Sequence, residues 1–264
     1  HVRSRRQRQM CIRDSPNYKN SDKSVFTNVQ SSTTDRLTEN GYKLNKTGFT
    51  IGTKFEQYED LYFSPSINTY FENIETNSTA TDALKKQEGN NFDTSFGYSL
   101  DFDKRNQKFM ATDGFRSEFT QRLPLLSDTY SVANYYTYSM YNKLPNDMVT
   151  YLSFYAAAIN GITGEDVKIS ERVKLPRSRL KGFEYSKVGP VDNGNFVGGN
   201  YATSLNLSTS LPMFFQSLDT ADVSYFIDLG NVWEVDYSST IDDSNKLRSS
   251  TGVGMDWLTP VGPL

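Results

Sequence analysis

The stretch Asp93–Lys104, DTSFGYSLDFDK, alternates between apolar and polar residues. Phe96, Tyr98, Leu100 and Phe102 fall on one face of an extended chain, and serine, glycine and aspartate residues fall on the other. Because successive side chains of a β-strand point to opposite faces, this period of two predicts a strand with one apolar face and one polar face.

The same alternation recurs along the chain, with turn residues in between, and predicts about ten strands. No segment has a convincing helical period. A helix over Tyr151–Ile159 is conceivable because alanine favours helices, but a strand fits its neighbours better. The sequence therefore predicts an all-β protein of antiparallel, up-and-down hairpins. Besides Asp93–Lys104, the predicted strands are Ser24–Ser32, Gly48–Glu56, Leu61–Glu75, Gly114–Leu123, Asp128–Tyr141, Met148–Ile162, Tyr201–Leu211, Val223–Trp233 and Leu247–Leu258.

The connectors between these strands alternate in length, which is typical of a transmembrane β-barrel with short turns at one end and long loops at the other. Charges on the polar strand faces, such as Arg116 and Asp228, also suit a wet lumen better than a dry sandwich core. The short connectors are Gln57–Asp60, Asn106–Asp113, Leu125–Ser127, Leu144–Asp147 and Pro212–Ala221. The long ones are Thr33–Thr47, Thr76–Asn91, Gly164–Gly199 and Val235–Lys246.

The composition allows two classes of protein. The chain has 264 residues, a net charge of −3 and 36% hydrophobic residues, yet it contains 17 Tyr and 17 Phe. It has no run of eighteen apolar residues, so the sequence offers no transmembrane helix. A membrane barrel produces this combination because only every second strand residue meets lipid. A soluble β-sandwich binding protein remains the alternative on composition alone.

Candidate catalytic and metal-binding residues are scarce. The chain has one cysteine, Cys11, and one histidine, His1, which excludes disulfide frameworks and Cys/His metal sites. No serine has a usable histidine, no phosphate-binding glycine loop is present, and the basic residues are dispersed. We therefore expect a protein that is not an enzyme and has no cofactor, no metal and no nucleic-acid partner.

The first fifteen residues, HVRSRRQRQMCIRDS, differ from the rest because they contain five arginines and lack the apolar core of a signal peptide. They resemble a translated adapter sequence. We expect residues 1–15 to be a non-native or disordered leader outside the fold, and residues 16–264 to form one partial barrel domain.

Four further motifs occur in a fixed order, each beside a predicted strand. They are RSRLKGFEYSKVGP at Arg177–Pro190, FVGGN at Phe196–Asn200, DLGNVW at Asp228–Trp233 and GMDWLTPVGPL at Gly254–Leu264. In this order they resemble the C-terminal barrel of the BamA family of outer-membrane-protein assembly factors, within the bacterial surface antigen family. The resemblance covers roughly residues 24–264 and is strongest after Glu171.

The resemblance implies that the long loop 164–199 folds back into the barrel. Its tip, Leu180, Lys181, Gly182 and Phe183, corresponds to the family's V/I-R-G-F/Y element, with Lys181 in place of arginine. The family arginine contacts a phenylalanine and an aspartate on the wall, which correspond to Phe226 and Asp228. A further acidic partner of the family falls at Ser208. We expect Lys181 to contact Asp228 less exactly than a bidentate arginine would.

The resemblance also assigns turn and packing residues. Asp101–Phe115 is similar to the family's D-x-R-x-x-x-F-x-P-T-x-G hairpin, a tight periplasmic turn in which Ala111 replaces the usual proline. Gly230 leaves room in the lumen for the incoming loop. The residues implied in these roles are Arg105, Thr112, Gly114, Gly198, Gly199, Gly230, Pro260 and Gly262.

The function implied is the folding and insertion of β-barrel proteins into the bacterial outer membrane. By resemblance, the chain holds about ten of the family's sixteen strands and lacks the periplasmic POTRA domains. The implied partners are the outer-membrane bilayer, unfolded outer-membrane proteins and, through the missing periplasmic domains, assembly-complex lipoproteins. A sister transporter (an autotransporter assembly factor or a two-partner secretion transporter) and a passive porin-like channel are the alternatives.

Overall fold

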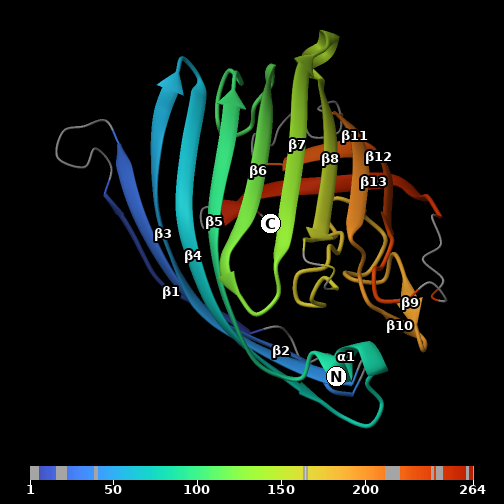
Figure 1. Cartoon of the computed structure of the whole chain (residues 1–264). Coiled ribbons are helices and arrows are strands. Elements are labelled where there is room, and N and C mark those ends of the chain that lie inside the picture. Colours follow the sequence, from blue (N-terminus) through green and yellow to red (C-terminus); the bar gives the residue numbers. More distant parts are fainter. Residues whose placement is uncertain are drawn as a thin grey trace.

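The computed structural model describes residues 6–15, 23–38, 41–162, 164, 166–211, 221–238, 241, 246–259 and 262–263. They form one curved antiparallel sheet of twelve strands, shown in Figure 1. The strand order is β1 to β8, then β11 to β14, with no pairing that closes the sheet. The chain therefore builds an incomplete barrel wall, as the sequence predicts.

The strands of this sheet are long enough to cross a bilayer, apart from the two-residue β14. A separate small hairpin, whose strands β9 and β10 have two residues each, lies between β8 and β11 in the chain. The bounds are β1 (Arg6–Ser15), β2 (Ser24–Arg36), β3 (Tyr42–Tyr58), β4 (Leu61–Thr76), β5 (Gly89–Asp103), β6 (Gly114–Ser127), β7 (Ser131–Lys143), β8 (Val149–Gly161), β9 (Val191–Asp192), β10 (Asn195–Phe196), β11 (Tyr201–Ser210), β12 (Ala221–Trp233), β13 (Arg248–Thr259) and β14 (Gly262–Pro263).

All ten predicted strands are present, including β8, where a helix was the alternative. Besides the 3₁₀ helix η2 (Pro145–Asp147), the sequence missed one short α-helix, α1 (Asp82–Lys86), between β4 and β5. The Thr81 hydroxyl caps this helix by accepting from the Leu84 backbone N–H, and the Leu84 side chain is buried beneath it. Among the described residues, no helix is long and apolar enough to span a membrane.

Residues 6–15 differ from the expectation of a leader outside the fold. Their backbone forms β1 and pairs with β2 from Arg6 opposite Thr33 to Ser15 opposite Val25, with an irregularity after Met10. The non-native origin of residues 1–15 stays a prediction.

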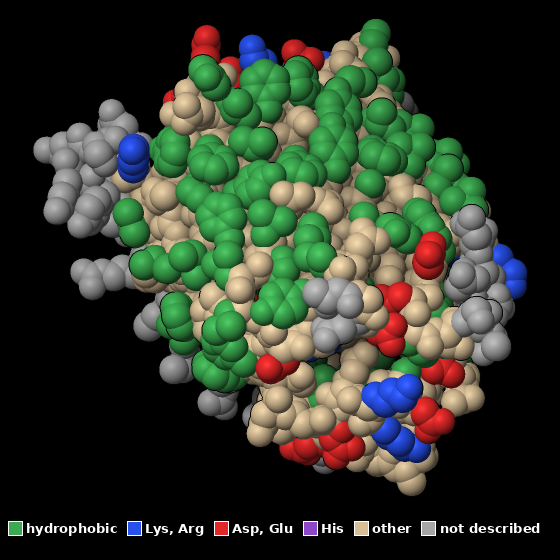
Figure 2. Space-filling model, viewed as in Figure 1, with side chains coloured by type: hydrophobic (Ala, Val, Ile, Leu, Met, Phe, Trp, Pro, Cys, Tyr) green, Lys and Arg blue, Asp and Glu red, His purple; other side chains and the backbone are tan. Residues whose placement is uncertain are grey.

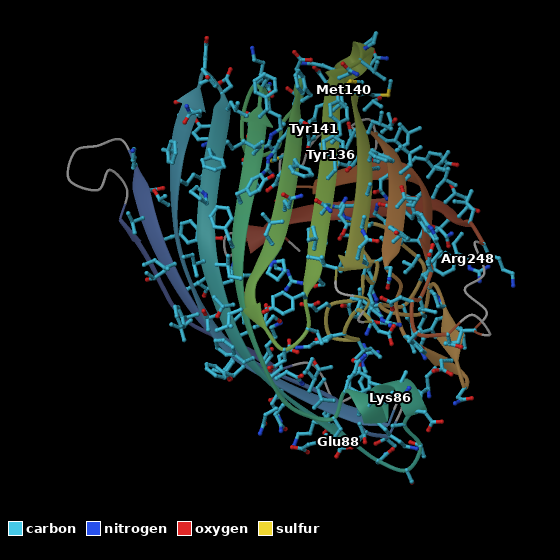
Figure 3. The ribbon with its side chains drawn as sticks, viewed as in Figure 1. Lys86, Glu88, Tyr136, Met140, Tyr141 and Arg248 are labelled. Atoms are coloured by element: carbon cyan, nitrogen blue, oxygen red, sulfur yellow. The ribbon has the colours of Figure 1, made fainter. Side chains whose placement is uncertain are left out.

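The connectors follow the predicted alternation only in part. The predicted connector Leu125–Ser127 belongs to β6, and residues 128–130 form a short connection to β7 at the end with the long loops. Short turns join β3 to β4, β5 to β6 and β7 to β8 at one end of the wall (Figure 1). The connector predicted at Thr33–Thr47 shrinks to residues 37–41, because β2 and β3 continue pairing to Arg36 and Tyr42. Figure 3 places Met140 and Tyr141 toward the short-turn end, and Lys86 and Glu88 at the end with the long connections.

The apolar strand faces point outward. Leu205, Leu207, Val253 and Met255 are exposed, and hydrophobic side chains spread over the outer face in Figure 2. Tyr98 is half-buried on the same apolar face as Phe96, against the rings of Phe63 and Phe119 on neighbouring strands. These side chains do not meet in a two-sheet core, so a sandwich is excluded for the described residues, and the outer face has the character of a lipid-facing wall.

Candidate functional site: the inner loop and its seat

The longest connection, residues 162–200 between β8 and β11, is called here the inner loop (residues 163 and 165 lie outside the described part). Its two halves meet where Val173 and Gly199 exchange backbone hydrogen bonds of 2.8 and 3.1 Å. Gly199 also lies so close to the Trp233 carbonyl that a Cβ would clash, and the neighbouring Gly198 has a φ of +77°. Glycine at both positions therefore lets the loop return directly to the wall.

An apolar cluster joins the inner loop to the strands. Leu175, Leu180 and Val188 of the loop are at most 5% exposed. They pack with residues of β7, β8, β11 and β12, namely Ala133, Ala157, Ile159, Ala202 and Val232. Small side chains on these strands bring the loop close to the sheet, so burial of apolar area holds the loop against the wall.

The four tip residues point in different directions. Leu180 is buried in the apolar cluster, and Phe183 packs partly against it. Lys181 turns toward β12, and Gly182 adopts a φ of +82° with Ser250 of β13 as its nearest neighbour. The glycine thus allows the backbone to turn immediately after the lysine.

The tip lysine lies where the resemblance implied. Lys181 Nζ is 3.4 Å from Asp228 Oδ2, and the Lys181 backbone N–H donates to the same oxygen at 3.0 Å. The ammonium also lies 4.5 Å from the centre of the Phe226 ring. Asp228 is fully buried while the Lys181 side chain is 42% exposed, so solvent screens the ammonium more than it screens the carboxylate.

Asn206, not Ser208, is the second wall residue that contacts this carboxylate. Asn206 Nδ2 donates to Asp228 Oδ1 at 2.9 Å and to the Arg179 carbonyl at 2.7 Å. Ser208 lines a cavity of about 340 Å³ together with Lys181, but no hydrogen bond joins the two residues. The family's further acidic partner falls at Ser208, and no motif pointed to the asparagine two residues earlier.

The surface beneath the tip is a row of short polar side chains across five adjacent strands. The strand registers align them on the inner face, and we call them the seat. Short side chains leave space for the loop, and the seat also supplies its hydrogen-bond partners. The seat comprises Ser139, Ser153, Asn206, Asp228 and Ser250.

Arg179 provides a second contact that the sequence reasoning missed. Its guanidinium donates to Thr137 Oγ1 at 3.2 Å and stacks 3.9 Å from the centre of the Tyr155 ring. Burial lowers the pKa of Arg179, although the guanidinium remains charged. Arg179 faces β7 and β8, whereas Lys181, two residues later, faces β12. The presence of an arginine near Lys181 was the available signal in the sequence.

A buried cation also ties the inner loop to the segment after β12. Arg172 donates to Asp236 Oδ1 at 3.0 Å and to the Val167 carbonyl, and it lies 4.3 Å from the Tyr237 ring centre. Burial lowers the pKa of Arg172. Burial, followed by the charge of Asp192, raises the pKa of Tyr237 well above its usual value.

The predicted turn residues lie away from the loop. Arg105 makes two hydrogen bonds of 2.8 Å to the carboxylate of Asp103, and Thr112 Oγ1 accepts from Asn106. Gly114 has a φ of +93° and no room for a Cβ, so the turn requires glycine there. These residues form a hydrogen-bonded turn at the opposite end of the wall.

Three predicted packing residues remain. Gly230 faces Leu175 and Leu180 of the inner loop, as expected of a residue that leaves room for it. Pro260 lies outside the described residues. Gly262 belongs to β14, and its backbone pairs with Thr259.

Comparison with known proteins gives one family match and several relatives. The family model of the Omp85 superfamily domain matches residues 13–264. The outer membrane protein assembly factor BamA of Neorickettsia risticii (strain Illinois) is 23% identical over 229 residues, which cover 84% of this chain and 31% of the relative. The human sorting and assembly machinery component 50 homolog is 25% identical over 171 residues, covering 60% of this chain and 36% of the relative. The chain thus spans about a third of the length of these relatives.

Solved structures show the same fold. BamA from Haemophilus ducreyi lacking POTRA domains 1–3 superposes with a TM-score of 0.79 at 18% identity, over 95% of this chain and 56% of that one. CdiB from Acinetobacter baumannii superposes with a TM-score of 0.54 at 10% identity, over 90% of this chain and 42% of that one. The wall is therefore closer in shape to the BamA barrel than to the CdiB barrel.

Proposed function

The chain belongs to the Omp85 superfamily, and on this premise we propose that it is the wall and inner loop of a protein that folds and inserts β-barrel proteins into the bacterial outer membrane. Both BamA and the sorting and assembly machinery component carry assembly in their names. The proposed partners are the outer-membrane bilayer, unfolded outer-membrane proteins and, through periplasmic domains, assembly lipoproteins. We propose no catalytic role.

One observation carries the proposal: the tip of the inner loop is held on the inside of the wall. Lys181 contacts Asp228 and Phe226 of β12, and the apolar cluster holds Leu180 beside them. A passive channel would predict a constricting loop rich in paired charges, with no contact between its tip and Asp228. Here the tip instead contacts short polar side chains and makes one ion pair with the wall.

A braced wall suits insertion for a physical reason. A strand that enters the hydrocarbon must have its backbone groups hydrogen-bonded, because each unpaired group costs several kcal/mol there. An exposed sheet edge can supply these bonds by pairing with the incoming strand. The wall must then keep its curvature while an edge accepts a new strand, and a loop anchored inside the wall would maintain that curvature.

The test is a reconstituted insertion assay with the complete parent protein in liposomes. The substrate is an unfolded outer-membrane barrel protein, and its folding is followed by heat-modifiable migration on gels. Lys181→Ala and Asp228→Ala should slow insertion, and Lys181→Arg should be tolerated. Unchanged insertion in Asp228→Ala would remove the basis of the proposal.

The same preparation separates the alternatives. A porin-like channel would conduct ions without accelerating substrate folding. A sister transporter would move a polypeptide across the liposome membrane instead of inserting it, so protease protection of the substrate distinguishes the two. The similarity in shape to the BamA barrel, with a TM-score of 0.79, supports insertion.

A further inference from the structure

Three consecutive residues near the start of the inner loop make hydrogen bonds to the β4–β7 side of the structure. The Ile169 backbone N–H donates to Gln87 Oε1 at 2.9 Å, and Ser170 Oγ donates to Glu72 Oε2 of β4 at 2.8 Å. Glu171 accepts from Arg122 of β6 and Ser131 of β7. Residues 169–171 therefore contact the wall on the β4–β7 side, whereas Lys181 contacts it at β12.

Glu171 makes the strongest of these contacts. Arg122 donates to Oε1 at 2.6 Å, and the Ser131 hydroxyl donates to Oε2 at 2.6 Å, so both carboxylate oxygens are used. The Glu171 side chain is only 8% exposed. Arg122 also lies 3.7 Å from Asp93 of β5. Charge-assisted hydrogen bonds of this length are stronger than neutral ones, and burial protects them from screening.

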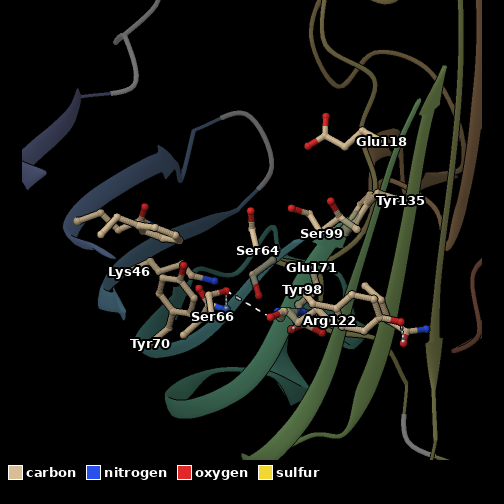
Figure 4. Close-up of a pocket in the computed structure, with 17 residues that line it drawn as sticks. Lys46, Ser64, Ser66, Tyr70, Tyr98, Ser99, Glu118, Arg122, Tyr135 and Glu171 are labelled. Carbon is tan, nitrogen blue, oxygen red and sulfur yellow. Dashed lines mark hydrogen bonds and ion pairs between the residues drawn. The ribbon is translucent and has the colours of Figure 1, made fainter. Parts of the chain in front are cut away.

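The site lies at the edge of a polar cavity of about 480 Å³ on the inner face, where Figure 4 shows Glu171 beside Arg122. The charge order here is the reverse of that at the tip. At the tip, the loop supplies a cation and the wall an acid. At residue 171, the loop supplies the acid and the wall the cation. A loop shifted along the wall would bring like charges together, so the two pairs define one position.

We propose that Glu171 is a second positioning residue, which anchors the base of the inner loop to β6 and β7 independently of the Lys181–Asp228 contact at the tip. The loop leaves the wall from β8, between these two anchors. It thereby links strands on both sides of β8. The effect of this anchor on insertion rests on the proposed function, whereas the anchor itself does not.

Two measurements on the complete protein follow the docking of the loop base (residues 169–171) and of the loop tip separately. Both use a background with Cys11→Ser and any other cysteine removed. Trypsin reports on the base, because Lys168 and Arg172 are 4% and 5% exposed while Lys187 in the same loop is exposed. A Gly182→Cys/Ser250→Cys pair reports on the tip. A Cβ at Gly182 would lie 3.7 Å from the Ser250 Cβ, within the range of disulfides. Because the φ of +82° strains any residue other than glycine, disulfide yields are compared only among variants that share this pair.

Glu171→Gln should raise cleavage after Lys168 and Arg172 by about tenfold relative to cleavage after Lys187, as expected when a charge-assisted hydrogen bond is weakened in a locally opening segment. Ser131→Ala, which removes one of the two donors, should give a smaller increase, and Glu171→Asp should restore part of the protection. The 182–250 disulfide should still form in Glu171→Gln and should fail in Asp228→Ala.

The matched control is Glu118→Gln, because Glu118 also pairs with an arginine of β6, Arg116, and makes no described hydrogen bond or ion pair with residues 168–172. It should leave cleavage unchanged. Equal protection in Glu171→Gln and Glu118→Gln would overturn the anchor, whatever the insertion assay shows. If Glu171→Gln raises cleavage after Lys168 and Arg172 but insertion stays normal, the anchor is supported. The same result counts against the role of the loop in the proposed function. Heat-modifiable migration of each variant verifies that it is folded.

Discussion

Asp228 receives two hydrogen bonds from the same residue on one oxygen, since both the backbone N–H and the side-chain ammonium of Lys181 point at Oδ2. Its other oxygen receives the amide of Asn206. The carboxylate thus holds the loop through a backbone contact that no substitution of Lys181, except by proline, would remove.

The two partners should therefore differ in importance. Lys181→Ala removes only a partly exposed ammonium and should cost about 0.5–1 kcal/mol of unfolding free energy. Asp228→Ala also leaves a buried amide and a backbone N–H without their acceptor, and should cost about 2–4 kcal/mol. The measurement is the denaturation midpoint of the folded barrel. Lys143→Ala, which breaks an exposed ion pair with Asp147, is the control and should leave the midpoint unchanged.

Gly230 should be sensitive to added volume. A Cβ there would lie 3.0 Å from Leu175 Cδ1 and 3.5 Å from Leu180 Cδ2, so Gly230→Val should push the loop outward at a cost of about 1–3 kcal/mol. Gly254→Val is the matched control, because its Cβ would meet only Ser224 Oγ and Phe226 Cδ1 at 3.4 Å or more. A lower yield of the 182–250 disulfide in Gly230→Val alone is the expected result.

Adjacent positions on β11 should respond oppositely to the same substitution. Leu207→Asp places a carboxylate on the exposed outer face and should destabilise the barrel in lipid by roughly 1–2 kcal/mol. Ser208→Asp places it in the cavity lined by Arg179 and Lys181, where it should stabilise the docked loop. Unfolding in liposomes measures both. Destabilisation of similar size at the two positions would contradict the assignment of faces.

Tyr237 should make stability fall at alkaline pH. Burial and Asp192 raise its pKa in the folded protein, so the phenol stays protonated there after the unfolded chain has begun to ionise near pH 10. This contribution is complete below pH 10 and is lost as the pH rises through and above that value. Wild type should lose at most about 1 kcal/mol per pH unit more than Tyr237→Phe, since the half-exposed ring is partly screened. Parallel curves from pH 8 to 11 would contradict this expectation.

The wall could be predicted from the sequence because its determinants are local. Alternation along Asp93–Lys104 and nine similar stretches fixes which side chains face outward, and turn residues such as Gly114 fix where strands end. The exact strand ends were less predictable. β2 and β3 extend beyond their alternating segments because each continues to pair with the other.

The site was only partly predictable. Lys181, Phe226 and Asp228 could be matched through a motif, and the structure brings them together. The roles of Asn206 and Glu171 could not be predicted from a motif. They depend on the register between strands and on where a 39-residue connection crosses the wall. α1 was missed because five residues are too few to show a helical period.

The seat beneath the loop tip has a consequence for how easily the tip can lift. If these side chains were leucines, withdrawal of the tip would expose apolar surface to water, and the hydrophobic effect would oppose it. Serine and asparagine side chains exchange their loop contacts for water at little net cost. The contact with the buried Asp228 carboxylate and the packing of Leu180 on its apolar neighbours oppose departure more strongly. The tip can therefore leave the seat and bind it again without the seat exposing an apolar surface inside the barrel.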